Sequence, residues 1–358
     1  MIRVVVVEDS PTQRAVLRKS LEADGDIVVV GEAATANGAL AAVQRGCPDV
    51  VTVDLHIPGG GELAIEQIME VAPKPILLLS ARLAGMRDEA MGAMGAGAAG
   101  VLAKPRHGDV DAEHTLRTKV RALQGVRPRQ KVTTSTATAA RLLPTAASIA
   151  ARGARRDHHP HAPTGRTPIV AIAASTGGPT AVTALLRSLA GIAAPVLLVQ
   201  HIDPQLTSSF ADWMDRTTGW DVEVAEAGMP LVPGRVHVGP GGYHVGVDAG
   251  RRVLLAADGD ELHRPSADRL FSSLATHAGK ETIAAVLTGM GNDGARGMLE
   301  LREAGGLTYA QDDRSSAVFG MAKAAVENGA VGRVLPLDAL GPAIRRAVQM
   351  MTAKAVRS

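Results

Sequence analysis

The stretch IVAIAASTGGP, residues 169–179, decides the fold predicted for the second half of the chain. Its first six residues are all apolar, which is typical of a strand buried on both faces of a parallel sheet. Ser175 and two glycines follow at once, and Pro179 suits the first turn of a helix. The stretch therefore predicts a strand, a tight turn that exposes Ser175, and a helix.

Similar units continue towards the C-terminus. Thr180–Leu189 has the pattern of a helix, and Val196–Gln200 and Ile283–Leu287 are further apolar runs of strand length. Between them, Asp221–Leu255 is rich in glycine and proline, which favours hairpins. We therefore predict a doubly wound, mostly parallel α/β domain with a β-hairpin over residues 167–358.

The first half repeats this alternation. Helical patterns such as Gln13–Ala23 and Glu62–Val71 follow short β-rich runs, so residues 1–124 predict a (βα)5, flavodoxin-like domain with a parallel sheet. The predicted strands are Ile2–Val7, Ile27–Gly31, Val50–Val53, Ile76–Leu79 and Val101–Leu102.

Length and composition limit the class of protein. At 358 residues the chain is too long for one ordinary domain. Hydrophobic residues make up 46% of the sequence, which is enough to form two cores. Cys47 is the only cysteine, which excludes an internal disulfide and a cysteine-based zinc cluster. No apolar run reaches the ~20 residues that span a bilayer, and no signal peptide is evident, so we expect a cytoplasmic protein without direct membrane insertion.

The basic residues gather in one segment. Residues 126–166 hold eight Lys and Arg against one acid, Asp157, although the net charge of the whole chain is only +2. The segment has no sustained apolar period. We predict a flexible basic linker over residues 125–166 that joins two mildly acidic domains.

Polar side chains follow the predicted strands of the first half. Because the carboxyl ends of parallel strands meet at one edge of a sheet, these side chains converge there. Carboxylates suit Mg²⁺, an aspartate can accept a phosphoryl group, and a lysine neutralises its charge. Each residue alone fits a helix cap or an exposed side chain, but the whole set predicts an aspartyl-phosphate switch. The set is Glu8, Asp9, Asp54, Ser80 and Lys104.

Three strands of the second half end in a candidate catalytic set. Ser175 follows the first, His201 follows the second, and Asp293 lies in the turn after the third. Nucleophilic acyl transfer uses these three residue types, and their order in the chain differs from that of lipase-like hydrolases. A phosphate-binding turn at Ser175 is the alternative, although the lysine of a P-loop is missing. The rival histidines are His237, His244, His263 and His277.

The first half contains the motifs Val-Val-Glu8-Asp9-Ser, Asp-Val-Val-Thr-Val-Asp54, Leu-Ser80-Ala and Lys104-Pro105. With these motifs it resembles two-component receiver domains over its whole length. The resemblance implies phosphorylation of Asp54 by a histidine kinase, with Ser80 and Lys104 in contact with the phosphoryl group. It also implies Mg²⁺ as cofactor, held by Glu8, Asp9, Asp54 and the carbonyl of His56.

Two positions depart from the receiver pattern. Ile57-Pro58 and three glycines follow the acceptor, where many receivers have Met-Pro-x-Met-Asp-Gly. Val101 stands where an aromatic switch residue is usual. The sequence therefore predicts phosphorylation more firmly than it predicts any particular aromatic flip.

The second half contains Ala-Ser175-Thr-Gly-Gly-Pro, Gln-His201, Pro240-Gly-Gly, Arg-Pro265-Ser-Ala-Asp, Leu-Thr-Gly-Met290-Gly-Asn-Asp293-Gly-Ala, and Ala-Gln311-Asp-Asp through Phe319-Gly-Met. With these motifs it closely resembles the catalytic domain of the CheB family of protein-glutamate methylesterases. Carried over, the resemblance implies Ser175 as nucleophile, His201 as general base and Asp293 as orienting acid. It implies the N–H groups of Thr176 and Met290 as the oxyanion hole. Ala173 and Ala322 depart from the family pattern without touching the triad.

The resemblance implies a function for the whole chain. It is hydrolysis of glutamate methyl esters on chemoreceptors, with release of methanol, in the adaptation of chemotaxis; deamidation of receptor glutamines would use the same chemistry. We expect no cofactor at the esterase site, and a receiver that covers Ser175 until Asp54 is phosphorylated.

Two alternatives stay open. The basic linker favours a nucleic-acid-binding output, but the output domain is acidic and shows no basic helix-turn-helix, so no nucleic acid is expected. The second alternative is a module that docks on receptors without catalysis.

Overall fold

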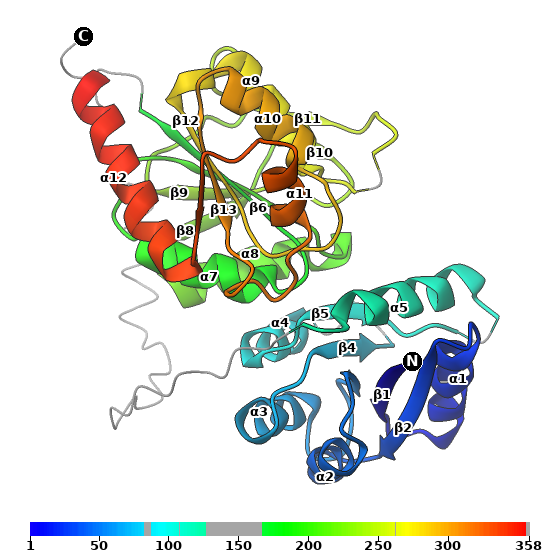
Figure 1. Ribbon diagram of the computed structural model, residues 1–358. Helices are drawn as coiled ribbons and strands as arrows, with labels where there is room; N and C mark the ends of the chain where they lie inside the picture. The colour runs from blue at the N-terminus through cyan, green and yellow to red at the C-terminus, as the bar shows by residue number, and fades with distance from the viewer. Residues whose placement is uncertain (82–86, 107, 127–166, 262, 356–358) are drawn as a thin grey trace, which may run out of the picture.

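The structure is a computed structural model that describes residues 1–81, 87–106, 108–126, 167–261 and 263–355 (Figure 1). Most of the predicted linker, from 127 to 166, lies outside the described residues, so the predicted domain limits stay a prediction. The described residues form two α/β lobes, one before and one after this segment of the sequence.

The first lobe is built on a five-stranded parallel sheet with the order β2-β1-β3-β4-β5, which confirms the predicted receiver fold. The order reverses between β1 and β3, where sheets of this kind open their functional crevice. Its strands are β1 (Ile2–Val7), β2 (Ile27–Ala33), β3 (Val50–Asp54), β4 (Ile76–Ser80) and β5 (Gly100–Ala103). Its helices are α1 (Pro11–Glu22), α2 (Ala36–Gly46), α3 (Gly61–Val71), α4 (Arg87–Ala96) and α5 (Val110–Leu123).

The second lobe is built on a seven-stranded sheet with the order β14-β13-β12-β6-β7-β9-β8, in which every neighbouring pair is parallel. This confirms the predicted doubly wound class. The stretch quoted first folds as predicted, because β6 (Ile169–Ala174) is buried throughout and Pro179 lies in the first turn of α7. The strands of this sheet are β6 (Ile169–Ala174), β7 (Val196–Gln200), β8 (Asp221–Val224), β9 (Arg235–Val238), β12 (Thr282–Val286), β13 (Leu307–Gln311) and β14 (Arg333–Leu335).

Helices cover both faces of this sheet (Figure 1). Leu185, Phe210 and Ile344 belong to one apolar core, on the face of α7, α8 and α12. Phe271 and Met298 belong to the other, on the face of α9, α10 and α11. The helices are α7 (Gly178–Ser188), α8 (Thr207–Thr218), α9 (Ala267–His277), α10 (Ala295–Glu303), α11 (Met321–Glu327) and α12 (Leu337–Ala355), with 3₁₀ turns η2 (Pro204–Leu206) and η3 (Gly279–Glu281).

The glycine- and proline-rich region contains one hairpin and one parallel pair. Strands β10 (His244–Val247) and β11 (Val253–Ala256) pair antiparallel in a sheet of their own, as expected. Strands β8 and β9 instead pair parallel and extend the main sheet. Parallel neighbours need a crossover, and the prolines that suggested hairpins, Pro230 and Pro233, lie in that crossover.

The two lobes meet through α4, β5 and the turn before β5. The N–H of Gly177 donates to the carbonyl of Ala99 (2.8 Å), and Thr180 Oγ1 donates to the carbonyl of Met94 (3.4 Å). Gly95 lies against Trp213, whose ring would be 3.3 Å from an added Cβ. The first lobe therefore rests on the turn that contains Ser175.

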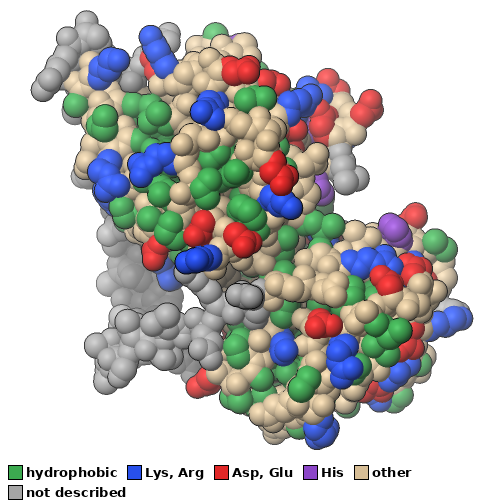
Figure 2. Space-filling view, viewed as in Figure 1, with side chains coloured by type: hydrophobic (Ala, Val, Ile, Leu, Met, Phe, Trp, Pro, Cys, Tyr) green, Lys and Arg blue, Asp and Glu red, His purple; other side chains and the backbone are tan. Residues whose placement is uncertain are grey.

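The described part of the chain has no helix with the length and apolarity that crossing a membrane requires. On the face shown in Figure 2, basic and acidic side chains are interspersed over both lobes.

A glycine at the contact of α9 and α10 gives the first testable prediction. A Cβ on Gly297 would lie 2.2 Å from the backbone oxygen of Asp268, so the two helices must separate in Gly297→Ala. Overpacking of this kind costs ~1–3 kcal/mol of unfolding free energy. Urea unfolding measures the loss. Gly92→Ala in α4 is the control, because its methyl would meet only the end of the Glu62 side chain; stability equal to the control would contradict the prediction.

Candidate active site

Ser175 lies in a turn that two glycines make possible. Its N–H donates to the carbonyl of Thr288 (3.0 Å), and its own carbonyl accepts from the N–H of Gly178 (2.8 Å). Gly177 has a φ of 76°, a conformation that favours glycine. A Cβ on Gly178 would lie 2.1 Å from Gln200 Oε1. The backbone therefore favours glycine at 177, and at 178 any side chain would displace the Gln200 amide.

The three predicted triad residues come from neighbouring strands in the middle of the sheet. Strands β12, β6 and β7 are adjacent in the sheet order. Ser175 follows β6, His201 follows β7, and Asp293 lies in the loop after β12. Because parallel neighbours are ~4.8 Å apart, the carboxyl ends of these strands bring the three segments together.

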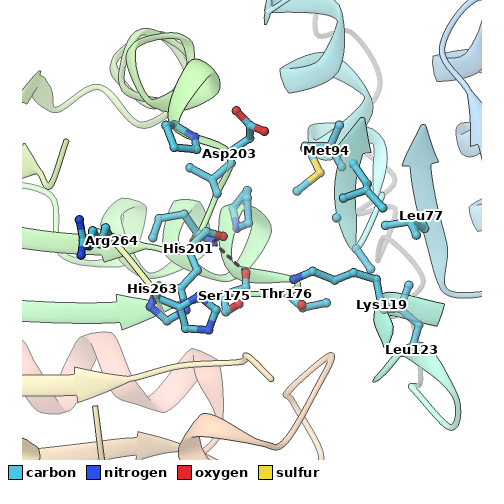
Figure 3. Close-up of a pocket in the computed structure, with 18 of the residues that line it drawn as sticks. Leu77, Met94, Lys119, Leu123, Ser175, Thr176, His201, Asp203, His263 and Arg264 are labelled. Carbon is cyan, nitrogen blue, oxygen red and sulfur yellow. Dashed lines mark hydrogen bonds between the residues drawn. The ribbon is translucent and has the colours of Figure 1, made fainter. Parts of the chain in front are cut away.

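His201 and Asp293 form a hydrogen-bonded pair. His201 Nε2 lies 2.8 Å from Asp293 Oδ2. The other ring nitrogen, His201 Nδ1, is buried and has no hydrogen-bond partner among the described residues. Ser175 and His201 line the same cavity (Figure 3), and Ser175 makes no hydrogen bond to Nδ1. Catalytic hydrogen bonds often form only with substrate, so this arrangement is compatible with the predicted roles.

The first turn of α9 holds the carboxylate of Asp293. Ser266 Oγ donates to Oδ1 (2.8 Å), the Ala267 N–H donates to Oδ2 (2.8 Å), and the Asp268 N–H donates to Oδ1 (2.9 Å). Burial alone would raise the pKa of Asp293, but the bonds from His201 and from these N–H groups outweigh it and hold the pKa well below its usual range. Asp293 is therefore suited to orient an imidazolium without taking its proton.

The hydrogen bonds that Ser266, Ala267 and Asp268 make to Asp293, here called the clamp, were not predicted from the sequence. Arg-Pro265-Ser-Ala-Asp was recognised only as a motif, without a role. The sequence did contain a signal for this helix start, because serine is a typical N-cap residue. In the structure, Ser266 Oγ accepts from the Arg269 N–H (3.3 Å) as an N-cap does.

Of the rival histidines, His263 contacts the site. Its ring stacks on that of His201, with centroids 4.1 Å apart and planes inclined by 21°. Burial, with the positive charges of His201 and Lys119, lowers the pKa of His263 to about 4. His263 is therefore neutral near pH 7 and covers one face of the His201 ring.

The other rivals lie elsewhere. His237 Nε2 accepts from the Val232 N–H (3.3 Å), and His244 Nδ1 accepts from the Ser266 N–H (3.3 Å). His277 is the last residue of α9.

The predicted oxyanion hole is made of backbone groups next to Ser175. Thr176 lines the cavity, and its carbonyl accepts from Thr288 Oγ1 (2.9 Å). The loop that contains Met290 packs on the nucleophile turn, since a Cβ on Gly289 would lie 2.8 Å from Ser175 Cβ. Within the described ranges, the N–H groups of Thr176 and Met290 donate to no other residue. Both remain available to an oxygen on a substrate, and their part in an oxyanion hole stays a prediction.

The cavity beside Ser175 has a volume of about 540 Å³ and is lined by both lobes. Figure 3 shows Ser175, His201 and His263 on one side and Lys119 and Leu123 of α5 on the other. The first lobe also contributes Leu77, Met94, Ala99, Gly100, Val101 and Leu102 to the wall.

The acidic cluster of the first lobe also assembles as predicted. Carboxylate oxygens of Glu8, Asp9 and Asp54 lie within 4.8 Å of one another. Lys104 Nζ lies 2.7 Å from Glu8 Oε2 and 2.8 Å from Asp54 Oδ2. Burial raises the pKa of Glu8, although Lys104 acts in the opposite direction. Asp54 Oδ1 is buried without a hydrogen-bond partner among the described residues.

Two predicted residues of this cluster are placed by the backbone. Ser80 ends β4 and is buried, and its carbonyl accepts from the Lys104 N–H (2.9 Å). His56 follows β3, and its exposed ring lies 3.6 Å from Glu89 Oε2. The part assigned to the His56 carbonyl stays a prediction.

His263 gives a prediction on pH. Its pKa is about 4 in the folded protein and 6.5 in a free histidine, so the unfolded chain takes up this proton first as the pH falls. This residue therefore lowers stability below pH 6.5. His263→Phe keeps a ring on His201 and should remove about 2 kcal/mol of the stability lost between pH 7 and pH 5. Urea unfolding at both pH values measures this difference, and an identical pH dependence in both proteins would disprove it.

Comparison with known proteins identifies two families. The family model described as CheB methylesterase matches residues 170–344, and that described as response regulator receiver domain matches residues 4–113. Protein-glutamate methylesterase/protein-glutamine glutaminase 2 of Burkholderia thailandensis is 37% identical over 98% of this chain and 100% of the relative. Protein-glutamate methylesterase/protein-glutamine glutaminase 1 of Myxococcus xanthus is 38% identical over 96% of both chains.

A solved structure is also similar. The crystal structure of the Thermotoga maritima CheB methylesterase catalytic domain has 34% sequence identity and a TM-score of 0.49, and it covers 51% of this chain and 99% of that chain. The relatives match nearly the full length of the chain, with its receiver domain. The chain therefore belongs to the CheB family of protein-glutamate methylesterases/protein-glutamine glutaminases.

Proposed function

We propose that this protein hydrolyses glutamate methyl esters on methylated chemoreceptors, releases methanol, and is switched on by phosphorylation of its receiver domain. The observation that carries the proposal is the His201–Asp293 pair beside Ser175, at the carboxyl edge of three adjacent strands. Membership of the CheB family supports the substrate. The proposal includes a cytoplasmic location and no binding of nucleic acid.

The proposed reaction begins at Ser175. Because His201 donates its Nε2–H to Asp293, the nitrogen that accepts the Ser175 proton is Nδ1. The serine oxygen attacks the ester carbon, and the N–H groups of Thr176 and Met290 stabilise the negative oxygen that forms. The imidazolium then gives its proton to the methoxy oxygen as the C–O bond breaks, so methanol leaves and an acyl-enzyme remains.

Water completes the cycle. His201 takes a proton from water, the hydroxide attacks the acyl carbon, and the proton returns to Ser175 as glutamate leaves. The low pKa of Asp293 keeps the carboxylate charged beside the imidazolium in both halves of the cycle. An amide in place of the ester would release ammonia, which is the glutaminase reaction in the names of the relatives.

Ser175→Ala tests the esterase. Loss of the nucleophile should reduce methanol release from methylated receptor at least ~1000-fold, as in other serine hydrolases. Ser209→Ala is the control, because Ser209 lies on α8 away from the cavity. Methanol release by Ser175→Ala at the wild-type rate would disprove a serine mechanism.

The receiver cluster fits Mg²⁺. Glu8, Asp9 and Asp54 offer hard oxygen donors within 4.8 Å, and the buried Asp54 Oδ1 has no other partner in the described residues. When bound, Mg²⁺ neutralises phosphoryl charge. In the proposal a histidine kinase is the phosphodonor: Asp54 attacks the phosphorus atom of its phosphohistidine, the P–N bond breaks and the kinase histidine leaves, while Ser80 and Lys104 bind the phosphoryl oxygens.

Strand β5 connects the proposed phosphorylation site to the esterase cavity. Lys104, which follows β5, pairs with Asp54 at one end. At the other end, Ala99 accepts the hydrogen bond from Gly177, and Gly100 and Val101 line the cavity. We propose that a phosphoryl group on Asp54 moves Lys104, shifts β5 and loosens the contact with Gly177.

Asp54→Asn tests this switch. Phosphoramidate is a phosphodonor that contains no carboxylate; with Mg²⁺ it should raise wild-type methanol release roughly 5-fold or more. Asp54→Asn should show no rise, and a chelator should remove the rise in wild type. A response that persists in Asp54→Asn would contradict the proposal.

A further inference from the structure

The wall that the first lobe contributes to the cavity carries one charged side chain among its described residues, Lys119. In Figure 3 it extends from α5 towards Ser175 and Thr176. The other receiver residues of the wall are apolar or glycine. A single ammonium group thus faces the esterase site from the opposite lobe.

Lys119 makes no ion pair with a described acid. Burial alone lowers the pKa of Lys119. The positive charge of Lys119 in turn helps to lower the pKa of His263, which also lines the cavity. The acid that lines the cavity, Asp203, already accepts from the Gln205 N–H (2.9 Å). Lys119 is half-buried, and partial loss of water around an ammonium without a counter-charge is costly, so the position favours an anion.

The placement of Lys119 is fixed by its helix. Arg117 Nε binds Asp24 (2.8 Å) and Arg121 Nε binds Asp26 (2.7 Å), which fastens α5 to the turn before β2. Leu116 and Val120 are buried in the core of the first lobe. The backbone at Lys119 therefore keeps its place at the cavity as long as the receiver stays docked.

The opposite wall offers a second kind of donor. The Thr176 N–H has no acceptor among the described residues, and Thr176 lines the cavity. Arg264, also on the wall, is exposed and already donates to the Gly259 carbonyl (2.6 Å). The remaining lining is largely aliphatic, from Pro179, Ile202, Met94, Leu102 and Leu123.

We propose that the cavity between the lobes binds a short aliphatic carboxylate, whose oxygens are held by the Lys119 ammonium and the Thr176 N–H. The volume of about 540 Å³ suits a small molecule with water. The Lys119 ammonium would pair with the negative charge of the carboxylate, and the Thr176 N–H would orient it through a directional hydrogen bond. The apolar wall would pack against the carbon chain.

This ligand would be a regulator of the proposed enzyme. Both lobes supply its contacts, so binding favours the docked arrangement of the lobes, in which Ser175 is covered. By linkage, phosphorylation that separates the lobes must lower the affinity for the ligand. The ligand must oppose phosphorylation by the same factor. The inference goes beyond the proposed function, since binding does not depend on ester hydrolysis.

Calorimetric titration with glutarate tests the site in the full-length unphosphorylated protein. Wild type should bind glutarate at millimolar concentrations or below. Lys119→Met keeps the length of the side chain but removes its charge, and it should weaken binding roughly tenfold or more. Lys119→Arg should retain binding. Lys19→Met is the matched control, because Lys19 is an exposed lysine of α1, and it should bind as wild type does.

The remaining arms make the outcome decisive. Glutaramide, which has the same carbon chain without charge, should not bind. Phosphoramidate with Mg²⁺ should weaken glutarate binding to wild type and leave binding to Asp54→Asn unchanged. No binding to wild type, equal binding to Lys119→Met, or equal binding of glutaramide would each overturn the proposal.

Failure of the esterase and failure of this site are distinguishable. Absence of methanol release from wild type would reject the proposed function and leave the titration as it stands. Methanol release with no glutarate binding would reject the carboxylate site alone.

Discussion

The second lobe depends on one carboxylate and the groups that hold it. Asp293 receives bonds from His201, Ser266 Oγ and the first N–H groups of α9, so it ties β7 and α9 to the loop after β12. The carboxylate accepts four charge-assisted hydrogen bonds, from His201 after β7 and from the first turn of α9. Because these donors come from distant segments of the chain, the bonds hold the segments in a fixed arrangement. The same bonds set the direction of the imidazole. Without them His201 could turn its Nε2 away, and Ser175 would face no defined base.

The glycine turn after Ser175 joins the proposed nucleophile to the lobe that is proposed to regulate it. Gly177 has the φ that brings its N–H outward, and this N–H donates to Ala99 of the receiver. Directly after Ala99 begins β5, a four-residue strand of about 13 Å, and Lys104 follows it at the acidic cluster. One short strand thus touches the nucleophile turn at one end and the proposed phosphoacceptor at the other. Such a connection needs little motion to be effective, because a shift of β5 acts on both ends.

Much of this could be predicted from the sequence, for physical reasons. Runs such as Ile169–Ala174 can only be buried strands, and parallel strands collect the residues that follow them at one edge, so the acidic cluster and the set of Ser175, His201 and Asp293 could be predicted. Features that depend on contacts between distant segments could not be predicted from the sequence. The stacking of His263 on His201, the parallel pairing of β8 and β9, and the approach of Lys119 to Thr176 have no local pattern. The clamp by Ser266 had a local signal, the N-cap, but the sequence does not say which carboxylate that helix end would meet.

The half-buried ammonium of Lys119 also bears on how easily the lobes separate. Moving a two-state equilibrium from 1:99 to 99:1 takes ~5.5 kcal/mol, so any contribution that opposes docking reduces the free energy that the switch must supply. The contacts of Met94, Gly95 and Ala99 favour docking, whereas the desolvation of Lys119 opposes it. In the proposals made above, a bound carboxylate offsets that cost and stabilises the docked state, and a phosphoryl group on Asp54 acts in the other direction. In the two proposals, the ligand and the phosphoryl group thus act in opposite directions on one docking equilibrium, which the charge of Lys119 keeps from favouring the docked form too strongly.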